Sequence, residues 1–128
     1  MSVAAQLDDL RGSLPGCSLV VFGDLFSQIT LCVSARDKHP QEQLDALCVT
    51  AGSLLDGSAA QSVRSALALP DGGTLNQAVI LGPSDMQIFL RSPVDNADVL
   101  CCVCSLNGDV EMTYTKARSA LNMIAQIQ

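Results

Sequence analysis

Aromatic and charged side chains are scarce in this 128-residue sequence. Tryptophan is absent, the only aromatic residues are three phenylalanines and one tyrosine, and 16% of the residues are charged against 48% that are hydrophobic. Proteins that bind single-stranded nucleic acid usually stack bases on aromatic side chains. The net charge of −6 repels phosphate backbones, and the seven basic residues are scattered along the chain. We therefore exclude nucleic acid as a partner.

Long apolar runs are also missing. No run approaches the roughly 18 residues that a membrane-spanning helix needs. The stretch MSVAAQLDDLRG places two aspartates where a signal peptide would have its apolar segment. We therefore expect a cytoplasmic protein without a membrane span, in which the cysteines stay reduced. The length predicts that residues 1–128 form a single domain with a substantial core.

Three segments carry apolar residues every three or four positions, which is the spacing of an amphipathic helix. The apolar positions of the first segment, which ends at Pro15-Gly16, are Val3, Leu7, Leu10 and Leu14. Those of the second, which begins after Pro40, are Leu44, Leu47, Cys48, Ala51 and Leu55. Those of the third are Tyr114, Ala117, Leu121 and Ile124. The second helix either continues through SAAQSVRSALAL or breaks near Gly57, and LPDGGTLN is expected to be a loop.

Five segments have the composition of β-strands: residues 17–22, 26–33, 76–82, 86–91 and 99–106. In residues 26–33, Ile29, Leu31 and Val33 alternate with less apolar residues, which predicts an edge strand with one side in solvent. SLVVF, QAVIL and VLCCVC are apolar on both faces, so helices must cover both sides of their sheet. The predicted fold is α/β, of the α+β kind: a three-layer α/β/α sandwich with a five-stranded antiparallel sheet. The predicted order of elements is α-β-β-α-β-β-β-α.

The densest chemical feature is VLCCVCSL, which holds Cys101, Cys102 and Cys104. In a strand, Cys102 and Cys104 share one face and Cys101 points to the other, so the three thiols cannot converge on one metal ion. Tetrahedral zinc usually adds histidine, and the only histidine is His39 in an expected loop. A disulfide between neighbours in one strand has poor geometry. We therefore expect buried thiols that act as small hydrophobic side chains and no metal site.

No segment has the pattern of a catalytic site. A G-x-S-x-G motif is absent, and His39 stands where a loop joins a helix. PDGGT lacks the Lys and Ser or Thr that follow the glycines of a phosphate-binding loop. Asp95 and Asp98 are interpreted as turn residues, and Asp8, Asp9 and Asp109 as solvated or helix-complementing charges. The sequence predicts no enzyme, no catalytic residue and no cofactor.

Function is therefore expected at a surface. Residues 76–82 are apolar and free of Lys or internal Pro, which makes them an edge strand of the kind that proteins normally protect. The long second helix is expected to lie beside this edge. The predicted dimer or partner interface consists of Leu44, Leu47, Cys48, Ala51, Leu55, Gln77, Val79 and Leu81.

Residues 3–127 resemble the roadblock/dynein light chain family. The resemblance rests on LDDLRGSLPGCSLVVFGD, on QEQLDAL, and on NQAVILGPSDMQIFLRSP followed by ADVLCCVCSLNGDVEMTYTKARSAL. It implies a profilin-like, roadblock architecture with residues 99–106 at the centre of the sheet. Residues 17–22 and 86–91 would flank this strand, and residues 26–33 and 76–82 would form the edges. Many family members have Asp-Gly in the first hairpin, whereas this chain has Gly23-Asp24.

The resemblance also implies a homodimer, or a heterodimer with a related domain, in which residues 76–82 pair and the long helices pack together. Family members act without catalysis as scaffolds, as motor-complex light chains or as regulators of Ras-like small GTPases. We therefore hypothesise a dimeric, non-catalytic adaptor. Two other classes stay open. One is a type III secretion-type chaperone, although such chaperones typically place three strands before the middle helix. The other is a thiol redox sensor that uses Cys101, Cys102 or Cys104.

Overall fold

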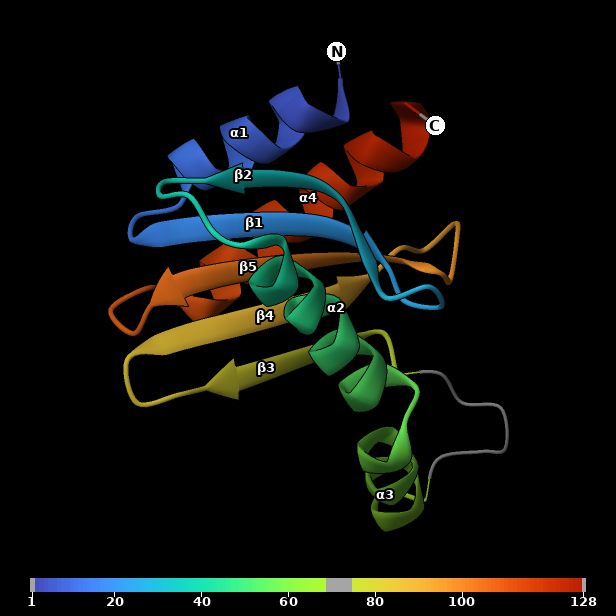
Figure 1. Ribbon diagram of the computed structural model, residues 1–128. Helices are drawn as coiled ribbons and strands as arrows, with labels where there is room; N and C mark the ends of the chain where they lie inside the picture. The colour runs from blue at the N-terminus through green and yellow to red at the C-terminus, as the bar shows by residue number, and fades with distance from the viewer. Residues whose placement is uncertain (1, 69–74, 128) are drawn as a thin grey trace.

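The computed structural model describes residues 2–68 and 75–127, and its five strands form one antiparallel sheet in the order β2-β1-β5-β4-β3 (Figure 1). The strands are β1 (Cys17–Asp24), β2 (Ile29–Ala35), β3 (Gln77–Leu81), β4 (Asp85–Arg91) and β5 (Asp98–Ser105). The helices are α1 (Val3–Ser13), α2 (Gln41–Leu55), α3 (Ser58–Ala66) and α4 (Val110–Ile127). The predicted strand order, with β5 in the centre, is confirmed.

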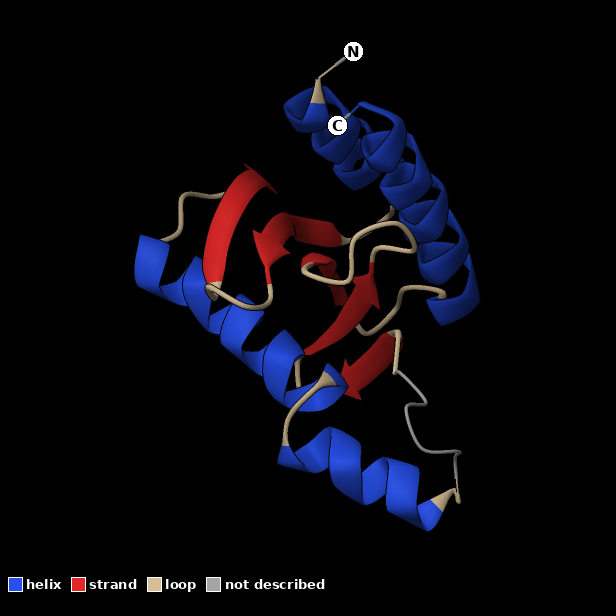
Figure 2. Cartoon of the chain, turned by 90° about the vertical axis from the view of Figure 1, so that its right-hand side faces the viewer, coloured by secondary structure: helices blue, strands red, loops and turns tan. Residues whose placement is uncertain are grey.

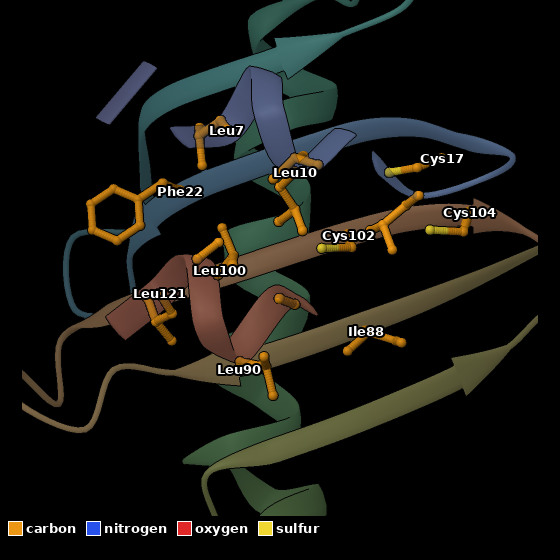
Figure 3. Close-up of a cluster of buried hydrophobic side chains, with 14 of the residues drawn as sticks. Leu7, Leu10, Cys17, Phe22, Ile88, Leu90, Leu100, Cys102, Cys104 and Leu121 are labelled. Atoms are coloured by element: carbon orange, nitrogen blue, oxygen red, sulfur yellow. The ribbon is translucent and has the colours of Figure 1, made fainter. Parts of the chain in front are cut away.

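The helices cover both faces of the sheet, as the two-sided apolar strands predict (Figures 1 and 2). Helices α1 and α4 pack on one face, where Leu7, Phe22, Leu100 and Leu121 belong to the first core cluster (Figure 3). Helix α2 crosses the other face above the second cluster, which includes Val21, Phe89 and Cys101. The three-layer α/β/α architecture is therefore confirmed. No helix of the described residues is long and apolar enough to cross a membrane.

The second predicted helix is two helices, because the chain breaks at Asp56 and Gly57. The N–H groups of both residues donate to the carbonyl of Gly52, at 2.8 and 3.0 Å, and so close the last turn of α2. A Cβ on Gly57 would lie 3.0 Å from the Cα of Ser53, so this close return of the chain favours glycine. The order of elements therefore gains α3. Of the loop predicted at residues 69–76 only Leu75 and Asn76 are described, and all of PDGGT lies outside the described residues.

Strand β2 is the predicted edge strand, and its solvent-facing side carries the apolar residues. Ile29, Leu31 and Val33 are 50%, 55% and 40% exposed, whereas Ser34 is buried. The reason is a polar connection to α1. The Ser34 hydroxyl donates to the Asp8 carboxylate at 2.5 Å and accepts from Nε of Arg11 at 2.8 Å. Asp8 is exposed, as expected for a solvated charge, and its carboxylate has the further role of tying α1 to β2.

Candidate functional site

Strand β3 has a free edge, and its hydrogen bonds to β4 show which residues face outward. The N–H of Arg91 donates to the carbonyl of Asn76, and the N–H of Gly82 donates to the carbonyl of Asp85, both at 2.8 Å. Residues in an antiparallel pair alternate between those that bond across the pair and those that do not. Every second residue of β3 therefore directs its N–H and carbonyl away from the sheet. These residues are Gln77, Val79 and Leu81.

The side chains of the same residues are also exposed. Val79 and Leu81 are 45% and 67% exposed. They pair with Ile88 and Met86 of β4, which belong to the core cluster under α1 and α4, so they lie on the α4 side of the sheet. The edge thus combines unpaired backbone groups with apolar side chains, a combination that promotes pairing with another strand.

An apolar hollow of about 500 Å³ lies between β3 and α4, next to this edge. Its lining includes Val79 and Ile88 from the sheet and Val110 and Tyr114 from α4. An apolar side chain from an added strand would find hydrophobic contacts there. The sequence did not point to this hollow, because Val110 and Tyr114 become neighbours of β3 only through the packing of α4.

The other predicted interface residues lie mainly in the core. Leu44, Cys48, Ala51 and Leu55 are at most 6% exposed and pack against the sheet within the second cluster. They are therefore not available at the surface of the folded chain. Leu47 is half-buried at the border of that cluster, as is Leu54. Leu54 was missed, although its spacing of seven residues from Leu47 places both on one side of α2.

The opposite edge of the sheet is less open to an added strand. The pairing of β2 with β1 is interrupted by a β-bulge between Phe22 and Gly23. The outer N–H of Thr30 already donates to the Asp45 carboxylate of α2 at 2.9 Å. That hydrogen bond lowers the pKa of Asp45. Bulges and capped backbone groups are means by which proteins protect an edge, so β3 is the edge that is more open to an added strand.

A buried arginine holds in place the residues that lead into β3. The guanidinium of Arg91 forms a salt bridge with Asp56 at 2.5 Å and donates to the carbonyls of Asn96, Leu75 and Leu55 at 2.8, 3.2 and 3.3 Å. It thereby joins the end of α2, the residues before β3 and the link between β4 and β5. In the sequence, Arg91 is one of seven scattered basic residues. Its position at the end of an apolar strand was the only sign that it would be buried and bind these carbonyls.

The carboxylate pair considered at Asp95 and Asp98 does not form a binding site. Asp95 is a turn residue as predicted, since its carboxylate accepts from the N–H of Ala97 at 3.0 Å. Asp98 instead begins β5 and is buried. The pKa of Asp98 is raised, mainly by its burial and to a lesser extent by the nearby charges of Asp95 and Asp24. Asp109 accepts from the N–H of Met112 at 3.1 Å, as expected for a residue at a helix start.

The cysteines lie on both sides of the sheet. Cys102 and Cys104 belong to the first core cluster and Cys101 to the second, as the alternation predicts. Burial raises the pKa of Cys101 and Cys102. Among the residues that the structure describes, no three Cys, His, Asp or Glu side chains come together to hold a metal ion. His39 is half-buried beside Gln43, with 3.4 Å between its Nδ1 and Oε1 of the glutamine.

No family model and no curated protein matches the sequence. Among solved structures, the chain is similar to a roadblock/LC7 domain from Streptomyces avermitilis, with 15% identity, a TM-score of 0.76, and 99% of this chain and 98% of that one covered. It is also similar to MglB in a tetrameric arrangement, with 16% identity, a TM-score of 0.77 and coverage of 98% and 86%. For the gliding protein MglB from Thermus thermophilus the values are 17%, 0.73, 98% and 90%. The resemblance inferred from the sequence is thus confirmed at the level of the fold: the chain has the roadblock fold.

Proposed function

We propose that this protein is a non-catalytic adaptor that dimerises through β3 and, as a dimer, regulates a Ras-like small GTPase or serves as a scaffold in a larger complex. The free, apolar edge of β3 carries this proposal. The fold supports it, because the roadblock resemblance implies dimers that act without catalysis. A similar structure, MglB, is known in a tetrameric arrangement.

The free edge is complementary to itself. Outward N–H and carbonyl groups at Gln77, Val79 and Leu81 allow two copies of β3 to pair antiparallel about a two-fold axis at Val79. In this register Val79 bonds to the same residue of the partner, and Gln77 bonds to the partner's Leu81. All outward groups of both strands are then satisfied, and the sheet continues from one protomer into the other.

The same register gives the exposed leucine a place to bind. Directly opposed residues in a sheet have their side chains on the same face. The partner's Leu81 therefore lies on the α4 side, opposite Gln77 and next to the hollow lined by Val79, Val110 and Tyr114. Burial of a leucine side chain contributes about 1.5–3 kcal/mol, and the two-fold axis provides two such contacts.

The α2 side of the sheet is the proposed docking face for the GTPase. The C-terminal half of α2 lies next to β3, so the two α2 helices of a dimer occupy the same face (Figure 1). Val49 of α2 and Phe26 of the β1–β2 turn are 46% and 68% exposed and line one groove. These side chains offer an apolar contact that the isolated chain leaves in solvent.

Light scattering on the full chain tests both parts of the proposal. We expect the mass of a dimer at tens of micromolar. We also expect a further gain in mass with one small GTPase, loaded with either GDP or a GTP analogue but not with both. A monomer at that concentration would overturn the dimer. A dimer that gains no mass with any GTPase would overturn the regulatory role and leave the scaffold.

The structure supports neither a secretion-type chaperone nor a sensor in which Cys101, Cys102 or Cys104 is the thiol that first reacts with an oxidant. Two strands precede α2 and three follow it, whereas secretion-type chaperones typically place three strands first. A redox sensor at Cys101, Cys102 or Cys104 requires a reactive thiolate. All three side chains are at most 2% exposed, and each has a raised pKa.

A further inference from the structure

Two cysteines lie directly opposite each other in adjacent strands. Cys17, the first residue of β1, pairs with Cys104 near the end of β5. The neighbouring pair is hydrogen-bonded, because the N–H of Ser105 donates to the carbonyl of Gly16 at 3.0 Å. The N–H of Cys17 donates to the carbonyl of Leu14 at 3.2 Å, and a β-bulge interrupts the ladder just beyond, between Cys17 and Leu19. Cys17 and Cys104 therefore lie opposite each other without ladder hydrogen bonds. Regular pairs of this kind have Cα atoms about 4.5 Å apart, at the short end of the range of disulfides.

The two thiols also contact each other. Both side chains lie on the α1 and α4 side of the sheet in one core cluster, where Figure 3 shows them on neighbouring strands. The Cys17 thiol donates to the carbonyl of Leu19 at 3.6 Å. Its interaction with the neighbouring Cys104 lowers the pKa of Cys17, and the same interaction together with burial raises that of Cys104. Because Cys17 directly follows the exposed Pro15 and Gly16, it is the sulfur that a peroxide reaches first, and Cys104 reacts second.

No other cysteine has this arrangement within the described part of the sheet. Cys102 is opposite Val20 and Ile88, and Cys101 is opposite Val21 and Phe89. Cys32 pairs with Phe22, and Cys48 belongs to α2. Cys17 and Cys104 are thus the only cysteines of these strands that face each other in register.

We propose that Cys17 and Cys104 form a reversible cross-strand disulfide when the protein meets a peroxide. The Cys17 thiolate attacks one oxygen of hydrogen peroxide, the O–O bond breaks, and sulfenic acid and hydroxide form. The Cys104 sulfur then attacks the Cys17 sulfur, the S–O bond breaks, and the second hydroxide leaves. With the thiol protons, the products are one disulfide and two waters. Two electrons pass from the sulfurs to the peroxide, and a small dithiol reverses the change.

The position of the pair explains how a reagent reaches it and what the bond would do. Cys17 is only 6% exposed but directly follows the exposed Pro15 and Gly16, so a peroxide needs a local opening of this turn alone. The bond would join the start of β1, just after α1, to the end of β5, just before α4. It closes a long loop of the chain and therefore restricts the unfolded state strongly.

The test is peroxide treatment of the full-length protein, followed by intact mass spectrometry and peptide mapping without reduction. We expect one product that has lost the mass of two hydrogen atoms, with the peptides of Cys17 and Cys104 linked. Its melting temperature should rise by about 10 °C, and dithiothreitol should reverse both changes. The proposal is overturned if peroxide leaves both thiols free, or adds oxygen or links chains at Cys32 instead.

Matched variants distinguish the proposed disulfide between Cys17 and Cys104 from oxidation of the other thiols. Cys17→Ala and Cys104→Ala should each abolish the loss of two hydrogens, whereas Cys102→Ala, buried in the same cluster, should retain it. A Cys102→Ala protein that no longer forms the bond would contradict the assignment. If an alanine variant fails to fold, peptide mapping of the wild-type protein decides the question alone. Because mass and peptide linkage are read per chain, the result does not depend on dimerisation.

Discussion

The sulfur of Cys48 on α2 lies directly above Gly23 on β1, in the space that a Cβ of residue 23 would occupy. A Cβ there would also lie 3.1 Å from the carbonyl oxygen of Ile29. The absence of a side chain at Gly23 therefore allows α2 to approach the sheet closely. The sequence shows Gly23 only as part of a turn, whereas the structure gives it a packing role within the second half of β1.

Gly23→Ala should destabilise the fold by about 1–3 kcal/mol, because α2 must shift or Cys48 must change its rotamer. Gly12→Ala is the matched control. A Cβ at Gly12 meets no atom within 4 Å, and its place in α1 predicts a gain of about 1 kcal/mol. Urea denaturation of both variants measures the two changes. Equal effects of the same sign would contradict the close contact between α2 and β1.

Arg91→Leu should cost about 1–3 kcal/mol, because the variant leaves the carbonyls of Leu55, Leu75 and Asn96 without their guanidinium donor and Asp56 without its ion pair. Asp56→Asn should cost less than about 1 kcal/mol, since Asp56 is 42% exposed and Arg91 keeps its carbonyl acceptors. Chemical denaturation compares the two variants. A larger loss for Asp56→Asn would show that the ion pair, not the set of carbonyl acceptors, determines the stability of this site.

Asp98→Asn should stabilise the protein at neutral pH and lose this advantage in acid. Burial and the charges of Asp95 and Asp24 raise the pKa of Asp98 in the folded state. Between the ordinary pKa and the raised one, the folded state binds more protons than the unfolded state, so wild-type stability falls as the pH rises through this window. Asp98 is also paired with Asp24 across β1 and β5.

Removal of this cross-strand repulsion should contribute about 0.5–1 kcal/mol at pH 7. Urea titrations of wild type and Asp98→Asn between pH 4 and pH 7 measure the difference. The difference in unfolding free energy between Asp98→Asn and wild type should increase as the pH increases. A gap that is constant with pH, or one that narrows, is incompatible with a raised pKa in the folded protein.

Most of the fold follows from patterns that depend on neighbours in sequence. The apolar residues on both faces of β5 and the short links between the last three strands are sufficient to predict a buried, antiparallel sheet. The break at Gly57 was one of two expectations, because a Gly in a helix weakens it without specifying where it ends. The facing of β2 could not be predicted, since it depends on the hydroxyl of Ser34 reaching Asp8 and Arg11 across the sheet.

The candidate site was predictable in part for the same reason. Residues Gln77, Val79 and Leu81 were identified because alternate residues of a strand share a face. Their outward backbone groups follow only from the register with β4. The apolar stripe of α2 was found, but helical spacing does not distinguish residues that pack on the chain's own sheet, such as Cys48 and Ala51, from those that meet a partner.

Val79→Lys should convert the proposed dimer into a monomer without loss of folding. Val79 is 45% exposed at the centre of β3, and a lysine there places two ammonium groups on the two-fold axis of the paired strands. The equivalent change on the other edge is Val33→Lys, because Val33 is 40% exposed within β2. Since neither valine is buried in the single chain, circular dichroism and thermal unfolding of the monomeric state should change little in either variant.

Sedimentation equilibrium measures the effect on dimerisation. The dissociation constant of the dimer should rise at least about tenfold for Val79→Lys and stay unchanged for Val33→Lys. The reason is that loss of one leucine- or valine-sized contact corresponds to more than about 1.4 kcal/mol. Dissociation by Val33→Lys alone would assign the interface to β2 and remove the β3 pairing from the proposal.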